Sequence, residues 1–126
     1  MPCVEIMTNV LRSNIPKGFL KTTGEIINKL LDKRSTLVSI RPNSLTEWTD
    51  GEGPAAVVHL YSIGKINKEL NTKATIALAT HIEKNIGVNA SRILLLFHDQ
   101  QPENVGLVGR FLVSSIPENS SIALKN

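Results

Sequence analysis

The chain has 126 residues, of which 41% are hydrophobic and 20% charged, and this composition is typical of one globular domain rather than a disordered chain. Its net charge of +3 comes from scattered Lys and Arg, so no basic stripe for nucleic-acid binding is predicted. The one cysteine, Cys3, excludes an internal disulfide, and the three histidines lack the spacing of metal ligands.

No apolar run in the sequence reaches the length that crosses a bilayer, and the N-terminus lacks the basic and apolar regions of a secretory signal. We therefore expect no membrane insertion and a reduced, cytoplasmic location. Release from the cell without a signal peptide stays open as an alternative.

The first half of the chain predicts a strand, a helix and a second strand. Residues Cys3–Met7 are short and mostly apolar, as in a strand. From Phe19 to Leu31 apolar residues recur every three or four positions, which predicts an amphipathic helix that ends in residues 32–35. Residues 36–41 alternate in the manner of a strand, and a polar loop follows over 43–54.

The second half repeats this order of elements without repeating the residues. Residues 55–64 are rich in β-forming side chains and predict a strand. Residues 67–86 follow helical spacing, with Gly87 where a helix C-cap is expected. A strongly apolar strand is predicted over 92–97, followed by a loop over 98–102.

Two strand–helix–strand units predict an α/β (α+β) fold, in which a four-stranded sheet carries both helices on one face. The strands at 55–61 and 93–97 are apolar at most positions, as in strands that are buried on both faces. Because one chain supplies a single helical layer, we expect another subunit to cover the second face.

The last part of the chain predicts two short strand-like pieces, around 104–107 and 110–113. We expect a single domain over residues 1–113. Residues 114–126 are polar with isolated apolar positions, and we expect them to form a loosely attached tail.

Pro2 follows Met1 directly, at the start of the first predicted strand. Proline lacks a backbone donor and is tolerated at the first residue of a strand, which is the structural interpretation. If Met1 is removed, however, Pro2 carries an N-terminal secondary amine, which is a titratable base. Position alone favours the structural interpretation, so the remaining motifs must decide.

Four stretches are informative together: MPCVEIMTNV at the N-terminus, IPKGFL at 15–20, HLYSIGKI at 59–66 and PENVG at 102–106. In this order and spacing they resemble the macrophage migration inhibitory factor family, a tautomerase-superfamily group that includes D-dopachrome tautomerase. The resemblance covers residues 2–112. It implies two βαβ units per subunit, a homotrimer whose sheets enclose a barrel-like channel, active sites between neighbouring subunits, and no cofactor or metal.

The resemblance also implies that Pro2, exposed by loss of Met1, is the catalytic base of a keto–enol tautomerase for phenylpyruvate-type α-keto acids or dopachrome-like compounds. Burial and nearby cations lower the pKa of an amine, which keeps it unprotonated and able to act as a base. Lys33 matches the family's substrate-binding lysine. The alternative is that Lys33 only ends the helix, where a positive charge is favoured by the helix dipole. Since the usual Gly-Lys-Pro is here Asp32-Lys33-Arg34, Arg34 is a candidate to assist or replace Lys33.

The remaining pocket residues are implied in the same way. Ile63 matches a residue whose backbone amide contacts the ligand, and Val105 belongs to the Asn-Val-Gly step. Leu94 and Leu96 stand where the best-known members place a tyrosine and an asparagine facing the neighbour's proline, and Leu107 replaces a tryptophan. We expect this more apolar pocket to keep its base desolvated but to lose substrate hydrogen bonds, at about 1 kcal/mol each.

A second function stays open alongside the enzyme. The altered leucines are also compatible with a leaderless, secreted, cytokine-like ligand that binds a cell-surface receptor and keeps a weak or vestigial active site. Ala55 and Val58 stand where some members carry a Cys-x-x-Cys, so thiol–disulfide activity from that motif is excluded.

Overall fold

The computed structural model describes residues 1–116. The larger elements are β1 (Cys3–Thr8), α1 (Phe19–Leu31), β2 (Leu37–Arg41), β3 (Ala56–Ser62), α2 (Lys68–Ile86) and β4 (Ile93–Asp99). A hairpin of β5 (Gly106–Leu107) and β6 (Phe111–Leu112) follows. Short 3-10 turns lie at η1 (Arg12–Asn14), η2 (Ala90–Arg92), η3 (Pro102–Asn104) and η4 (Val113–Ser115).

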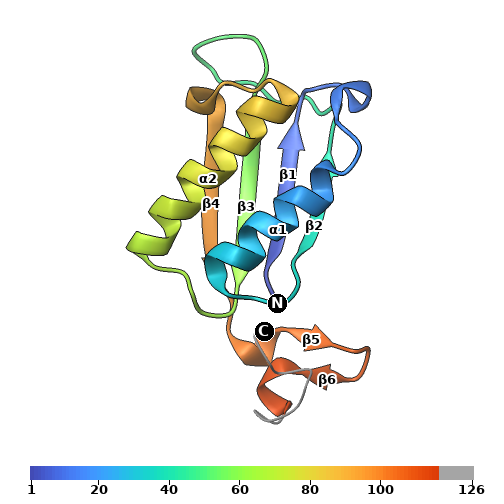
Figure 1. Cartoon of the computed structure of the whole chain (residues 1–126), viewed down its shortest axis with the longest axis vertical. Helices are drawn as coiled ribbons and strands as arrows, with labels where there is room; N and C mark the ends of the chain where they lie inside the picture. Colours follow the sequence, from blue (N-terminus) through green and yellow to red (C-terminus); the bar gives the residue numbers. More distant parts are fainter. Residues whose placement is uncertain (117–126) are drawn as a thin grey trace.

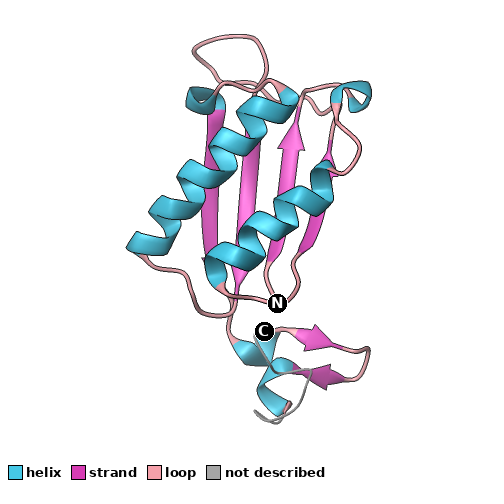
Figure 2. Ribbon diagram, viewed as in Figure 1, coloured by secondary structure: helices cyan, strands magenta, loops and turns pink. Residues whose placement is uncertain are grey.

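The sheet has the strand order β2-β1-β3-β4. β1 runs parallel to β2 and β3 runs parallel to β4, while the central pair β1 and β3 is antiparallel. Each strand–helix–strand unit therefore contributes one parallel pair, and the two units join at β1 and β3. Both helices cover the same face of the sheet (Figure 1, Figure 2). The predicted fold class is confirmed.

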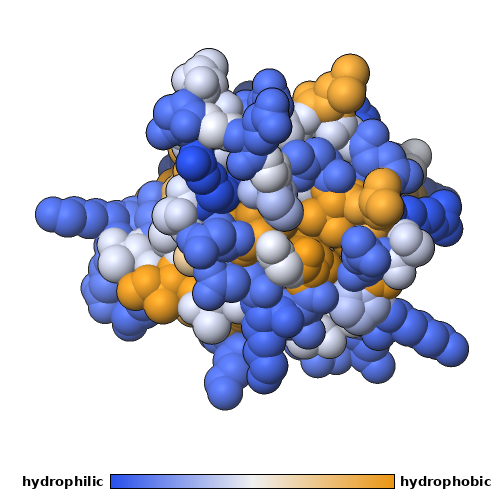
Figure 3. Space-filling view, turned by 90° about the horizontal axis from the view of Figure 1, so that it is seen from above, coloured by the Kyte–Doolittle hydropathy of each residue, from blue (hydrophilic) through white to orange (hydrophobic). Residues whose placement is uncertain are grey.

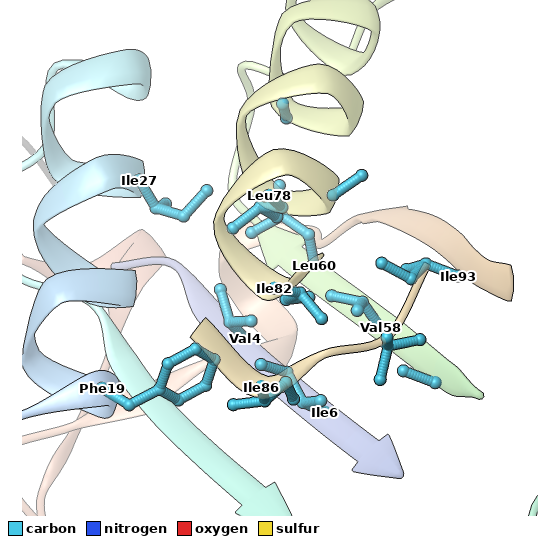
Figure 4. Close-up of a cluster of buried hydrophobic side chains, with 14 of the residues drawn as sticks. Val4, Ile6, Phe19, Ile27, Val58, Leu60, Leu78, Ile82, Ile86 and Ile93 are labelled. Carbon is cyan, nitrogen blue, oxygen red and sulfur yellow. The ribbon is translucent and has the colours of Figure 1, made fainter. Parts of the chain in front are cut away.

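The core lies between the helices and this covered face. Alternate residues of β1 and β3 point into it, as in Val4 and Leu60, because successive side chains of a strand face opposite sides. Helices α1 and α2 contribute apolar residues at the predicted spacing, among them Ile27, Leu78 and Ile82 (Figure 4). As predicted, α2 ends at Gly87, whose φ of 77° is the left-handed conformation of a helix C-cap.

One buried polar cluster joins the two helices. The His81 Nε2 atom lies 2.8 Å from the Thr23 hydroxyl, and the ring stacks on Phe19 with centroids 4.8 Å apart. The Thr23 hydroxyl donates its own proton to the Phe19 carbonyl at 2.7 Å, so it accepts from His81 Nε2–H. Asn85 donates to His81 Nδ1 at 3.1 Å. His81 is therefore held neutral, and its burial lowers the pKa of the ring.

β4 differs from its prediction at both ends. It begins at Ile93, because Arg92 belongs to the preceding 3-10 turn, and it extends to Asp99 instead of ending at residue 97. The loop predicted over 98–102 is thus wrong for its first two residues. His98 is held in the strand by ring contacts across the sheet, with Tyr61 at 4.5 Å between centroids and with His59 Nδ1 at 2.8 Å from its Nε2.

The second face of the sheet is open in the single chain. Leu94 and Leu96 on this face are 43% and 39% exposed. Hydrophobic residues also show among hydrophilic ones at the end of the molecule opposite the N-terminus (Figure 3). No helix within residues 1–116 is both long and apolar enough to cross a membrane. Of the predicted tail, residues 114–115 lie in η4, and residues 117–126 lie outside the described part of the chain.

Candidate functional site

Pro2 lies at the end of the sheet where β1 begins, the end from which the β5–β6 hairpin projects (Figure 1). Its side chain is buried, with less than 2% exposed. The Pro2 carbonyl accepts a hydrogen bond of 3.0 Å from the Leu37 N–H, which ties this residue to the start of β2. In this structure Met1 is present, so the Pro2 nitrogen is part of a peptide bond.

The end of β3 lies beside Pro2. Cys3 pairs with Tyr61 in the antiparallel ladder, so one step further along both strands Pro2 faces Ser62. The Ser62 carbonyl accepts from the Gln100 N–H at 2.8 Å, on the β4 side of the strand. Since the carbonyls of Pro2 and Ser62 both point to outer strands, the two residues form a non-hydrogen-bonded pair, with Cα atoms about 4.5 Å apart. This position needs no backbone donor, which accounts for the proline.

The chain turns sharply after β3. Half-buried Ile63 follows the strand, and then Gly64 and Lys65 both adopt the left-handed conformation, with φ of 71° and 63°. The Gly64 N–H donates to the Asp99 carboxylate at 3.0 Å, which fixes the turn to the end of β4. A non-glycine residue in this conformation costs about 1 kcal/mol or more, so the direction of Lys65 is imposed by the fold.

Lys33 lies at the same end of the sheet, just after α1. Asp32 ends this helix with a φ of 51°, and the Lys33 N–H donates to the Asn28 carbonyl at 2.9 Å. Burial lowers the pKa of the Lys33 ammonium group, and the charge of Lys65 acts in the same direction, while Asp32 opposes them. The amino group of Met1 also has a lowered pKa, because it is partly buried and faces the charge of Lys33.

The structure therefore brings together three of the predicted site residues, Pro2, Lys33 and Ile63. Arg34 is exposed and directly follows Lys33. The other predicted residues lie elsewhere in the chain. Leu94 and Leu96 project from the open face of β4, where their register partners are Val57 and His59 of β3. They are level with Met7 and Glu5 of β1, not with its start.

Val105 and Leu107 belong to the hairpin region beyond β4, and both are half-buried. The Val105 carbonyl accepts from the Val113 N–H at 2.8 Å, which closes the hairpin on itself. The predicted pocket is thus divided over three surfaces of one chain: the Pro2 end of the sheet, the open face and the hairpin.

Sequence reasoning did not assign a role to Ser62 or Lys65. For Ser62 a signal was present, because it continues the buried positions Ala56, Val58 and Leu60 of β3 but is polar. The role of Lys65 depends on a turn that only the folded chain shows. Within residues 1–116 no three His, Cys, Asp or Glu side chains form a group that could hold a metal ion.

Comparison with known proteins gives a consistent result. A sequence model of the macrophage migration inhibitory factor family matches residues 1–113. The macrophage migration inhibitory factor of Xenopus tropicalis is 32% identical over 111 residues, which cover 86% of this chain and 96% of that protein. A macrophage migration inhibitory factor homolog of Trichuris trichiura is 31% identical, with 86% of this chain and 97% of that protein covered.

Solved structures show the same fold. The macrophage migration inhibitory factor of Trichinella spiralis superposes with a TM-score of 0.80 at 24% identity, over 84% of this chain and 96% of that one. The protein from Oncomelania hupensis gives a TM-score of 0.84 at 20% identity, over 89% of this chain and 83% of that one. The chain described here belongs to the macrophage migration inhibitory factor family.

Proposed function

We propose that this protein is a cofactor-free keto–enol tautomerase whose base is the Pro2 amine, freed by removal of Met1. The observation that carries the proposal is the lowered pKa of the amino group at this end of the sheet, caused by burial and by Lys33. Met1 is 39% exposed and Pro2 less than 2%. An amine on Pro2 lies one residue further along the chain at the same end of the sheet, where burial and a nearby cation favour its neutral, basic form.

The reaction moves one proton between the carbon next to a carbonyl and the carbonyl oxygen. The lone pair of the Pro2 nitrogen takes the proton from carbon, which leaves an enolate and a protonated pyrrolidine. That pyrrolidine then gives a proton to the enolate oxygen and returns to its neutral form. The ring holds the nitrogen in a fixed direction, so little entropy is lost when it is aimed at the substrate.

Lys33 and Ile63 suit the binding of an α-keto acid. The half-buried Lys33 ammonium group offers a positive charge for the substrate carboxylate, and such a charge-assisted contact is stronger than a neutral hydrogen bond. Ile63 directly follows β3, and its backbone amide is the second contact that we propose for the substrate. Phenylpyruvate and dopachrome-like compounds combine a carbonyl with an apolar ring system and are the substrates that we propose for this apolar site.

We further infer that a second subunit completes the site in a homotrimer. Leu94 and Leu96 are exposed on the open face, and Phe111 and Leu112 of the hairpin are exposed at 43% and 46%. Burying such side chains between subunits is favourable at about 25 cal/mol per Å² of apolar surface. We expect sedimentation equilibrium to give the mass of three chains, and a monomer mass at low micromolar concentration would contradict the inference.

The test of the proposed base is a comparison of wild type and Pro2→Gly on phenylpyruvate enolisation and on conversion of D-dopachrome methyl ester. Intact-mass spectrometry first establishes that Met1 is absent from the purified protein. Pro54→Gly, at an exposed proline in the loop before β3, serves as the matched control and should keep the wild-type rate. Equal rates for wild type and Pro2→Gly would disprove the role of Pro2, as would full activity of protein that retains Met1.

A further inference from the structure

Among the described residues 1–116, the hydroxyl group of Ser62 finds no hydrogen-bond partner. Its Oγ atom is one of two buried side-chain oxygen or nitrogen atoms, within the described part of the chain, that make no hydrogen bond. Ser62 itself is only 1% exposed. A buried polar atom without a partner is rare in folded proteins and carries a desolvation penalty. Its presence at this position therefore needs a reason other than packing.

The neighbour of Ser62 across the sheet is Pro2. The side chains of Val4 and Leu60 point into the core, and Pro2 and Ser62 lie two residues further along the same strands, so they share that face. In a non-hydrogen-bonded antiparallel pair the opposite side chains are closest, with Cβ atoms about 5 Å apart. The Ser62 side chain therefore lies next to Pro2, whose nitrogen carries no hydrogen while Met1 is attached.

We propose that Ser62 is a positioning residue for the catalytic base, and that its hydroxyl oxygen accepts a hydrogen bond from the Pro2 amine once Met1 has been removed. This inference rests on the proposed function. Removal of Met1 gives the Pro2 nitrogen one hydrogen and one lone pair. The hydrogen is held by Ser62, so the lone pair is directed away from the serine and toward the substrate.

The proton balance during turnover is simple. When the amine takes the substrate proton, the nitrogen carries two hydrogens: one stays on the nitrogen and is hydrogen-bonded to the Ser62 oxygen, and the other is delivered to the enolate oxygen. Ser62 neither gains nor loses a proton. Because hydrogen bonds to charged groups are stronger than those to neutral groups, Ser62 stabilises the protonated amine more than the neutral one. Loss of the hydroxyl should therefore lower the pKa of the base.

The first experiment measures phenylpyruvate enolisation over pH for wild type, Ser62→Ala and Ser62→Thr. For Ser62→Ala we expect kcat to fall about tenfold, with a smaller change in KM and with the acidic limb of the profile moved to lower pH. Ser62→Thr keeps a hydroxyl and should restore the position of that limb. Ser13→Ala removes an exposed serine of η1 and should behave as wild type. An unchanged rate and profile for Ser62→Ala would overturn the proposal.

The second experiment is a thermodynamic cycle that does not depend on activity. The unfolding equilibrium is measured for wild type and Ser62→Ala, each with Pro2 as the first residue and with one extra residue ahead of Pro2. In the extended form Ser62→Ala should be neutral or stabilising, since it removes an unpaired buried hydroxyl. In the processed form the same change should raise the unfolding constant about fivefold or more, because a hydrogen bond is lost.

The two forms separate the possible outcomes. An equal effect of Ser62→Ala in both forms would show that Ser62 does not contact the amine, whatever the enzyme does. Full activity of Pro2→Gly would instead refute the proposed function. The unfolding measurements on the two forms would still show whether the Pro2 amine and the Ser62 hydroxyl are hydrogen-bonded.

Discussion

The contact between Thr23 and His81 allows a prediction that can be worked out in detail. Thr23→Val replaces a fully buried hydroxyl by a methyl group of similar size, so the packing is kept. The His81 Nε2–H, which donates to that hydroxyl at 2.8 Å, then loses this acceptor. A buried donor without a partner costs about 1–3 kcal/mol, and we expect the free energy of unfolding to fall by that amount.

The control is to make the same Thr23→Val change in a His81→Leu variant, which lacks the Nε2–H donor. In that background Thr23→Val should cost well below 1 kcal/mol, because removing both partners of a buried hydrogen bond is nearly neutral. Urea unfolding of the four proteins at one fixed protein concentration gives the coupling between the two residues, which we expect to be about 1 kcal/mol or more. Additive effects of the two substitutions would refute the assignment of this hydrogen bond.

The same cluster predicts a dependence of stability on pH. The pKa of His81 is lowered in the folded protein, so as pH falls the unfolded chain binds a proton first. Stability is therefore complete above the unfolded pKa of about 6.5, and it is lost as pH falls from there toward the lower folded pKa. His81→Gln offers a donor to Thr23 but does not titrate, and it should lack this part of the decline. An equal decline in both proteins would contradict the assigned neutral state.

Three further predictions concern single residues. Lys33→Met should raise KM for phenylpyruvate and move the acidic limb of its rate profile to higher pH, because the cation that lowers the pKa of the N-terminal amine is gone; an unchanged profile would contradict this. Leu78→Ala in the core should lower the free energy of unfolding by about 3 kcal/mol in urea titrations. Asn67→Ala removes the side chain that accepts from the Leu70 N–H at 2.9 Å and should cost about 1 kcal/mol in the same titrations.

Much of the fold could be predicted because it is encoded locally. The spacing of apolar residues in 19–31 and 67–86 predicts which side of each helix faces the sheet. Gly87, with its left-handed backbone conformation, marks the end of α2. The length of β4 could not be predicted in this way. His98 and Asp99 are polar, and they stay in the strand because of partners that are distant in sequence, such as Tyr61 and Gly64.

The site shows the same limit. Lys33 could be named from the resemblance, but a lysine that merely closes a helix has the same local sequence. Its place beside the N-terminus follows from β1 pairing with β2, which begins four residues later at Leu37. The sequence signals Ser62 as a polar residue at a buried strand position, but whether its hydroxyl has a partner depends on the residue across the sheet. That residue is Pro2, and its free nitrogen exists only after Met1 has been removed.

The strand-start position of Pro2 and its proposed role as a base are connected by one structural feature. Pro2 faces Ser62 in a non-hydrogen-bonded position, so the pairing of β1 with β3 needs no backbone N–H from Pro2. The Pro2 nitrogen therefore makes no hydrogen bond within the sheet and is available to act as a base. A different first residue would bring a primary amine, which carries two hydrogens when neutral and three when charged. The buried position offers one unpaired acceptor, the Ser62 hydroxyl, and each unpaired donor would add a desolvation penalty. Proline brings the fewest hydrogens of any N-terminal residue and holds its lone pair in a fixed direction, so the residue that starts the strand at least cost is also the residue best suited to be the base.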